Sequence, residues 1–259
     1  MPELLPRISV LFITYNRLVT LGPTLDAFLT KTDYPRDLLE LVCCDDCSPP
    51  TVQRELRRMP FDIHCLAAKR RGLGANVNQG LRAATCDLVL QLQDDWECTG
   101  PADYLLHAVS ALESVSEVGM VILKRHPNDL LLHSLRSCSG GVLRVFANRP
   151  EVKIENVGEH AYTDWPHLKR RSFHEKLGAY AVGVPMWEME LEFSRRVNAQ
   201  KGTFVADIEG LNAFHHIGED YSHNWPWKKR LIAAASRVSV LRSGLDGLRT
   251  MARRLRRLK

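Results

Sequence analysis

The sequence predicts an α/β fold in which a mostly parallel sheet is flanked by helices. Short apolar runs rich in β-branched residues alternate with segments whose apolar residues recur every three or four positions, as in buried strands and amphipathic helices. Polar clusters follow three of the apolar runs, at 14–17, 45–48 and 94–95. Because parallel strands bring their carboxyl ends to one edge of a sheet, we expect these clusters to form one ligand site.

The expected elements follow in chain order. Strands are predicted at 8–14, 39–44, 63–66, 87–92, 118–123 and 204–206, with hairpin-like strands within 129–157. Helices are predicted around Leu21–Phe28 and at 51–59, 75–84, 103–115 and 187–196. The segment 164–175 is dense in His, Lys and Arg. It either faces an anionic ligand or begins a solvated helix.

Composition limits the class of protein. The 259 residues are 45% hydrophobic and 25% charged, enough to build a core in one large domain or two small ones. No apolar run approaches the roughly 18 residues of a spanning helix, and the first residues lack signal-peptide features. We therefore expect a cytoplasmic protein. The seven cysteines are an odd number, which favours reduced thiols over disulfides. Cys43, Cys44 and Cys47 are expected to be small buried side chains and not a zinc site, because no second Cys/His pair follows them at finger spacing.

The positive charge is concentrated in residues 226–259. This tail holds eleven Lys and Arg residues and one acid, whereas residues 1–225 hold 24 basic and 29 acidic residues. Its apolar residues recur at helical spacing after Trp225 and Trp227. We predict a basic amphipathic helix that binds an anionic membrane surface at the inner face of the membrane. The alternative is a helix packed on the domain; nucleic acid is disfavoured because no recognition fold accompanies the charge.

Four motifs carry a resemblance to a known family. They are Ser9–Arg17, Cys44–Ser48, Arg71–Gly80 and Leu92–Trp96. In this order and spacing they resemble family 2 glycosyltransferases of the GT-A fold, closely over residues 8–100 and loosely to about residue 220. The resemblance implies a Rossmann-like GT-A domain over residues 1–225, with a nucleotide-sugar half (1–100) and an acceptor half (101–225). It also implies an inverting transferase that uses a nucleotide-diphosphate sugar and Mn²⁺ or Mg²⁺.

The resemblance also implies roles for single residues. Tyr15 and Asp46 would contact the base, Arg71 and Asn78 would line the nucleotide site, and Asp94 would lie near the ribose. Thr14 and Arg17, from the first polar cluster, complete the expected nucleotide-sugar site. Asp95 would hold the metal together with His216, or His215 as the alternative. The family's Asp-X-Asp motif has its first acid where this chain has Leu92, which leaves Asp94 and Asp95 to supply the carboxylates.

The catalytic base is expected in the helix that begins near Trp187. Glu188, Glu190 and Glu192 lie early in it, and family members carry an acidic motif at a corresponding helix start. By motif position Glu188 is the first choice and Glu190 the second. Acidic residues in a first helical turn also complement the helix dipole without any catalytic role.

The leading prediction is therefore a sugar transferase acting on a carbohydrate or lipid-linked acceptor. The alternatives are a nucleotidyltransferase and a non-catalytic protein that binds a sugar nucleotide. The first alternative is disfavoured because a Gly-rich loop with a basic residue does not follow the first strand. Gly72-Leu-Gly74 also lacks the spacing of a dinucleotide fingerprint, and the P-loop motif is absent.

Overall fold

The computed structural model describes residues 5–149, 160–197 and 202–218. The chain divides into two units, Met1–His215 and His216–Lys259, and the predicted tail at 226–259 lies outside the described residues. None of the described helices has the length and apolar character needed to span a bilayer. All seven cysteines are free thiols in the structure.

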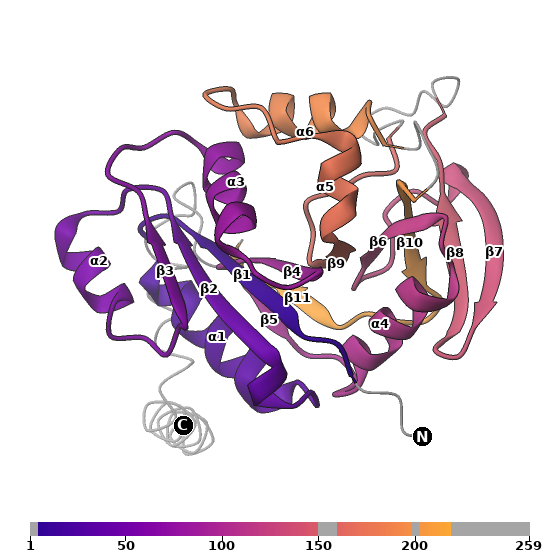
Figure 1. Cartoon of the computed structure of the whole chain (residues 1–259), viewed down its shortest axis with the longest axis horizontal. Helices are drawn as coiled ribbons and strands as arrows, with labels where there is room; N and C mark the ends of the chain where they lie inside the picture. The colour runs from indigo at the N-terminus through magenta and orange to yellow at the C-terminus, as the bar shows by residue number, and fades with distance from the viewer. Residues whose placement is uncertain (1–4, 150–159, 198–201, 219–259) are drawn as a thin grey trace, which may run out of the picture. The chain divides into compact units, whose positions relative to one another are not determined.

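Strands and helices alternate through the first unit (Figure 1). The strands are β1 (Ile8–Thr14), β2 (Leu39–Asp45), β3 (Ile63–Leu66), β4 (Leu88–Gln93), β5 (Trp96–Cys98), β6 (Val118–Ile122), β7 (Leu132–Cys138), β8 (Gly141–Phe146), β9 (His167–Arg170), β10 (Phe204–Ile208) and β11 (Phe214–His216). The α-helices are α1 (Leu18–Lys31), α2 (Pro50–Leu56), α3 (Leu73–Ala83), α4 (Tyr104–Ser114), α5 (Arg171–Leu177) and α6 (Met186–Ser194). The predicted hairpin within 129–157 is β7 and β8, which pair antiparallel.

The main sheet has the strand order β3-β2-β1-β4-β9-β6-β10-β8-β7. β3, β2, β1 and β4 are mutually parallel, as the alternating pattern predicts. β9 pairs antiparallel with both β4 and β6, and β10 pairs parallel with β6. The sheet is therefore parallel in its first half and mixed in its second. Its carboxyl edge, where β1, β2, β4 and β6 end, carries the three polar clusters.

The basic segment 164–175 forms β9 and, from Arg171, α5. The predicted solvated helix start is therefore wrong for Lys169, which lies in a strand. Lys169 is fully buried, and its Nζ donates to Gln91 Oε1 at 2.8 Å and to the Tyr180 hydroxyl at 3.3 Å. Burial holds the pKa of this lysine well below its usual value. The reason is topological, because β9 lies between two other strands and is covered by helices.

Helices cover both faces of the sheet (Figure 1). α1 and α4 lie on one face, and α3, α5 and α6 lie on the other. Two clusters of buried hydrophobic residues match these layers. The first contains Phe12, Phe28 and Tyr104, and the second contains Val77 and Phe193. Burying apolar side chains on both sides of the strands explains why β1 and β2 are buried along their whole length.

Two glycines let α3 approach its neighbours closely. A Cβ at Gly74 would lie 2.0 Å from the carbonyl oxygen of Ala181, and one at Gly80 would lie 2.4 Å from Cys44 Sγ. The Gly72-Leu-Gly74 stretch therefore serves helix packing. The N-terminus of α3 is held against the segment that leads into α6.

We expect Gly74→Ala to lower the free energy of unfolding by about 1–3 kcal/mol, because the added methyl group must displace backbone. Gly22 in α1 is the matched control, since a Cβ there meets no atom within 4 Å. Gly22→Ala should change the same quantity by less than about 1 kcal/mol, because helix propensity favours alanine while the following Pro23 disfavours it. Urea unfolding measures both variants. Equal effects at the two sites would contradict the packing role of Gly74.

Candidate functional site

The loops that follow β1 and β2 are strained and hold each other in place. Asn16 (φ 53°) and Cys47 (φ 65°) both adopt the left-handed conformation, which non-glycine residues rarely occupy. The Asn16 N–H donates to Ser48 Oγ at 2.7 Å, and the Ser48 N–H donates to Asp45 Oδ2 at 2.9 Å. Such strain persists only where the surroundings enforce it, and it is concentrated at functional sites.

Asp46 organises the loop between β3 and α3. Its carboxylate is buried and accepts the backbone N–H groups of Arg71 at 2.8 Å and Gly72 at 2.9 Å. The guanidinium of Arg70 lies 4.0 Å from the centre of the Tyr15 ring, a cation–π contact. The predicted base-contacting residues, Tyr15 and Asp46, therefore flank one loop, and Asp46 holds that loop in its conformation.

A pocket of about 340 Å³ opens beside this loop. It brings together three predicted residues, Asp46, Arg71 and Asn78, and adds the cations Lys69 and Arg82. We call it the nucleotide-side pocket. Lys69 and Arg82 were not predicted as site residues. The run of three basic residues at 69–71 could have indicated Lys69. Three cations around a cavity suit an anionic ligand.

Asn78 lines the nucleotide-side pocket, but both polar atoms of its amide form hydrogen bonds with the protein backbone. Its Nδ2 donates to the carbonyl oxygen of Tyr180 at 2.9 Å, and its Oδ1 accepts the Tyr180 N–H at 3.0 Å. The side chain is buried. Asn78 thus ties α3 to the segment before α6 and shapes the pocket wall.

The predicted residues Thr14, Arg17, Asp94 and Asp95 meet where β1 and β4 end. Arg17 Nη1 lies 2.6 Å from Asp95 Oδ2 and 3.3 Å from Asp94 Oδ1, and Thr14 Oγ1 donates to Asp94 Oδ2 at 2.6 Å. Both carboxylates are buried. Burial raises the pKa of Asp94 to about 7, although the Thr14 hydrogen bond and the Arg17 charge oppose this shift. The site therefore has a buried acidic pair with an arginine as its counter-ion.

In the described arrangement Arg17 is the counter-ion of both carboxylates, so a divalent cation beside them would compete with its guanidinium. Among the described residues, no group of three or more His, Cys, Asp or Glu side chains converges as a metal site. His216 belongs to the second unit of the chain, and His215 is exposed.

The two candidate bases have different surroundings on α6. Glu188 is exposed, whereas Glu190 is partly buried and its Oε1 accepts the Asp164 N–H at 3.2 Å. Burial, followed by the nearby charge of Asp164, raises the pKa of Glu190 to about 7. Asp164 Oδ2 accepts from Gln93 Nε2 at 2.6 Å. This bond joins the surroundings of Glu190 to the end of β4, directly before the acidic pair.

Glu190 lines a second pocket of about 260 Å³, which we call the base pocket. His126, Tyr162 and Trp187 also line it. The sequence analysis missed His126, Tyr162 and Asp164, because only the fold brings them to Glu190 and no local pattern marks them. A carboxylate whose pKa lies near neutrality in a partly apolar pocket is suited to accept a proton.

The chain is similar to known proteins in both sequence and fold. The family described as Glycosyl transferase family 2 matches residues 9–139. No curated protein matches the chain.

Among solved structures, residues 1–349 of S. aureus TarS in complex with UDP-GlcNAc are similar, with 18% identity and a TM-score of 0.57 over 82% of this chain and 60% of that one. The same TarS fragment without a named ligand matches at 17% identity with a TM-score of 0.58, over 83% of this chain and 61% of that one. A mannosyltransferase of Pyrobaculum calidifontis, PcManGT, with GDP-Man and Mn²⁺, matches at 24% identity with a TM-score of 0.48, over 70% of this chain and 49% of that one. The chain thus spans about 60% of the length of the TarS fragment. The two TarS structures confirm the predicted GT-A fold.

We expect Arg17→Gln to tighten Mn²⁺ binding by at least about tenfold, because it removes the positive group that an ion would have to displace. Arg17→Lys keeps a positive charge and should bind the ion as weakly as the native chain. Electron paramagnetic resonance of free Mn²⁺ at pH 8, without nucleotide, measures all three. If Arg17→Gln binds no more tightly than the native chain, the guanidinium does not compete for the carboxylates.

Proposed function

Because the chain belongs to glycosyl transferase family 2, we propose that it transfers a sugar from a nucleotide-diphosphate sugar to an acceptor hydroxyl with inversion at the anomeric carbon. One observation carries the proposal. The nucleotide-side pocket, the Arg17–Asp94–Asp95 cluster and the base pocket follow one another along the carboxyl edge of the sheet. A single displacement needs this order, because the acceptor and its base must lie on the side of the anomeric carbon opposite the leaving nucleoside diphosphate.

The donor end of the site is proposed to bind the nucleotide. Tyr15 and Asp46 contact the base, and Asp94 lies near the ribose, as the family resemblance implies. Lys69, Arg71 and Arg82 supply positive charge around the nucleotide-side pocket, which favours a diphosphate. The solved complex of the TarS fragment with UDP-GlcNAc supports nucleotide-diphosphate sugars as the class of donor to test.

Negative charge develops on the diphosphate as it leaves. Arg17 is the cation that lies between the nucleotide-side pocket and the base pocket, where β1 and β4 end. A fixed positive group stabilises a leaving anion without reorganisation of solvent. The requirement for Mn²⁺ or Mg²⁺ that the resemblance implies stays a prediction, with Asp95 as a proposed ligand. No step here depends on it, because Arg17 holds the acidic pair in the described arrangement.

Glu190 is the proposed base. Inversion requires a carboxylate that takes the proton of the acceptor hydroxyl while the hydroxyl oxygen attacks the anomeric carbon opposite the diphosphate. The pKa of about 7 gives Glu190 more basicity than an ordinary glutamate while it stays ionised in mildly alkaline solution. Glu188, which motif position favoured, is exposed on the same helix and becomes the second choice.

Two other functions make different predictions for the same assay. A nucleotidyltransferase would release pyrophosphate, whereas a sugar transferase releases a nucleoside diphosphate. A non-catalytic protein would bind the donor and release neither. The position of Glu190 in the base pocket, together with its pKa raised to about 7 by burial, supports turnover over binding alone, because these are the features of a general base.

We expect Glu190→Gln to lower the transfer rate about 10²–10⁴-fold, because the amide keeps the shape but cannot accept a proton. Glu188→Gln, two positions along and exposed, is the matched control and should keep most of the rate. Release of nucleoside diphosphate from a panel of UDP-, GDP- and dTDP-sugars measures both variants.

The same assay tests the pH dependence. Only ionised Glu190 is active, so the native rate should fall about tenfold per pH unit below pH 7 and level off above it. A full rate with Glu190→Gln would overturn the assignment of the base. Pyrophosphate as the product, or donor binding without any release, would overturn the proposed function itself.

The tail at 226–259 is proposed to hold this cytoplasmic enzyme at the anionic inner face of the membrane, near a lipid-linked or membrane-proximal acceptor. Its eleven basic residues against one acid, with apolar residues at helical spacing, combine the two forces that bind a helix to such a surface.

The full chain should sediment with vesicles containing phosphatidylglycerol, less so as salt rises, and poorly with neutral phosphatidylcholine vesicles. A chain ending at His223 should stay folded and remain in solution. If the shortened chain unfolds instead, the tail is packed on the domain and the membrane proposal fails.

A further inference from the structure

A third pocket lies beside the base pocket and has no part in the function proposed above. It encloses about 600 Å³ and we call it the outer pocket. Its polar and aromatic lining includes Lys124, Arg125, Asp129, Arg144, Trp165, Glu209 and Asn212. His126 and Pro127 line both this pocket and the base pocket, so the two cavities share one wall.

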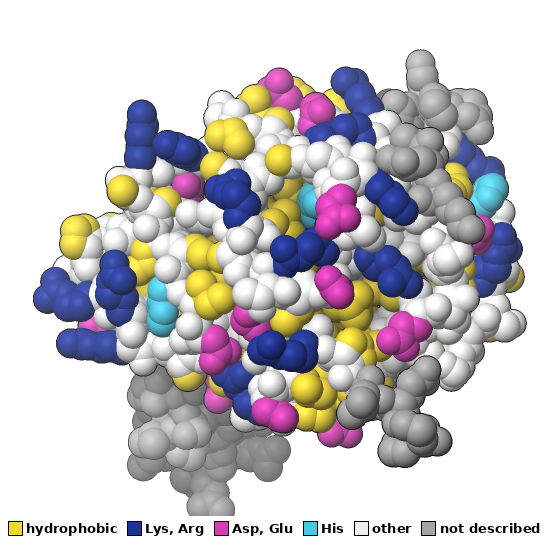
Figure 2. Space-filling view, in the orientation of Figure 1, with side chains coloured by type: hydrophobic (Ala, Val, Ile, Leu, Met, Phe, Trp, Pro, Cys, Tyr) yellow, Lys and Arg dark blue, Asp and Glu magenta, His cyan; other side chains and the backbone are white. Residues whose placement is uncertain are grey.

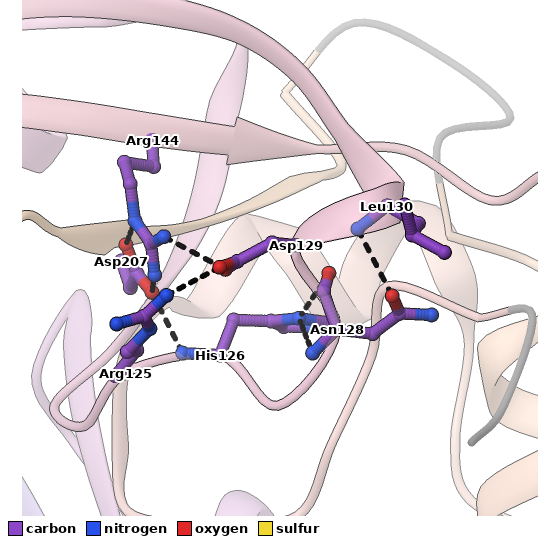
Figure 3. Close-up of polar contacts among 7 residues, drawn as sticks. All are labelled: Arg125, His126, Asn128, Asp129, Leu130, Arg144 and Asp207. Atoms are coloured by element: carbon purple, nitrogen blue, oxygen red, sulfur yellow. Dashed lines mark hydrogen bonds and ion pairs between the residues drawn. The ribbon is translucent and has the colours of Figure 1, made fainter.

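The shared wall is a loop held firmly by buried charges (Figure 3). Asp207, at the end of β10, accepts the His126 N–H at 2.7 Å and the Arg144 Nε–H at 2.7 Å. Arg144 Nη1 in turn donates to Asp129 at 2.8 Å, and Arg125 pairs with the same carboxylate. Because Asp207 is fully buried and Arg144 is 9% exposed, the bonds that Asp207 accepts are shielded from water and fix the loop.

The His126 ring ties this loop to the base pocket. It is 2% exposed, stacks on Phe146 with 4.1 Å between ring centres, and has its Nε2 3.0 Å from the carbonyl oxygen of Ala161. Ala161 directly precedes Tyr162 and Thr163, which line the base pocket. The spacing between the two cavities is therefore built into the fold.

The outer pocket has the chemistry of a carbohydrate site. Trp165 lies against Trp96, with 5.9 Å between ring centres, and the Lys124 Nζ is 5.9 Å from the Trp165 ring. Lys124 also donates to Asn212 Oδ1 at 3.0 Å, and Glu209 is exposed at the rim. An aromatic surface beside planar amide and carboxylate groups provides apolar contact and paired hydrogen bonds, which suit a pyranose ring and its hydroxyls.

The charges of the outer pocket favour a neutral ligand. Lys124, Arg125 and Arg144 are offset by three carboxylates nearby, those of Asp129, Asp207 and Glu209. In Figure 2, basic and acidic side chains are likewise interspersed over the middle of the face shown. A polyanionic acceptor would require an excess of positive charge along its path.

We propose that the outer pocket binds the neutral sugar unit next to the accepting unit, so that the acceptor is a neutral glycan chain of at least two units rather than a single sugar. This inference rests on the proposed function, which sets the accepting hydroxyl in the base pocket beside Glu190. The chain crosses the ridge at Pro127, an exposed residue common to both cavities. The loop at His126 and Pro127 then sets the spacing between the accepting sugar unit and the unit before it.

The test uses neutral gluco-, manno-, galacto- and N-acetylglucosamine oligosaccharides of one to four units as probes. Binding to the full chain is measured by saturation-transfer NMR with UDP present, and transfer is measured with the donor panel. In at least one series the tetrasaccharide should bind at least tenfold more tightly than the monosaccharide. Glu209→Ala and Asn212→Ala, both at exposed positions, should each reduce this ratio about 3- to 10-fold through a lost hydrogen bond.

Arg58→Ala, an exposed position after α2, is the control and should leave the ratio as in the native chain. Equal binding of all lengths in every series, or ratios that Glu209→Ala and Asn212→Ala do not change, would overturn the proposal. So would tight, salt-dependent binding of a polyanionic probe such as polyphosphate in place of every neutral glycan. Loss of nucleoside diphosphate release with the length preference intact would refute the proposed transfer reaction instead, so the two failures are distinguishable.

Discussion

The pairing of β9 with β4 on one side and β6 on the other joins the two halves of the site. It places Asp164 and Trp165, which precede β9, at the same edge as the acidic pair that follows β4. Asp164 then bonds both to Gln93 at the end of β4 and to Glu190 on α6. Without β9 between β4 and β6, Asp164 would not link the end of β4 to Glu190. The fully buried Lys169 in β9 shows how tightly the insertion is enclosed.

Two carboxylates along this edge have pKa values raised to about 7, Asp94 and Glu190, and burial is the largest cause for both. Each has another carboxylate nearby, but their other neighbours differ. Beside Asp94 and Asp95, the guanidinium of Arg17 and the hydroxyl of Thr14 stabilise the negative charge of Asp94 when it forms. Glu190 has the carboxylate of Asp164 beside it, so its ionised form is disfavoured further and binds a proton more readily. The carboxylate of Asp94 is therefore suited to pair with a cation, and the carboxylate of Glu190 is suited to accept a proton.

The two halves of the sheet shape their pockets by different means. In the parallel half, backbone loops with left-handed residues at Asn16 and Cys47 are locked by Asp45 and Asp46. In the mixed half, side chains from β8 and β10 fix the loop after β6 through Arg144 and Asp207. The first half places cations around its pocket, and the second places aromatic rings and balanced charges around its own.

The sequence by itself determined the parallel half of the fold and the polar clusters at its strand ends. Strands 8–14, 39–44 and 63–66 and the acids at 46, 94 and 95 are marked by local patterns, because periodicity and turn chemistry depend on near neighbours. Only the tertiary structure decided that residues 167–170 form a strand, that Arg17 lies on the acidic pair, and that Glu190 rather than Glu188 is shielded. Those outcomes depend on burial by segments far along the chain. Asp164, Tyr162 and His126 approach α6 through the fold alone, and no pattern within α6 records which of its glutamates they will surround.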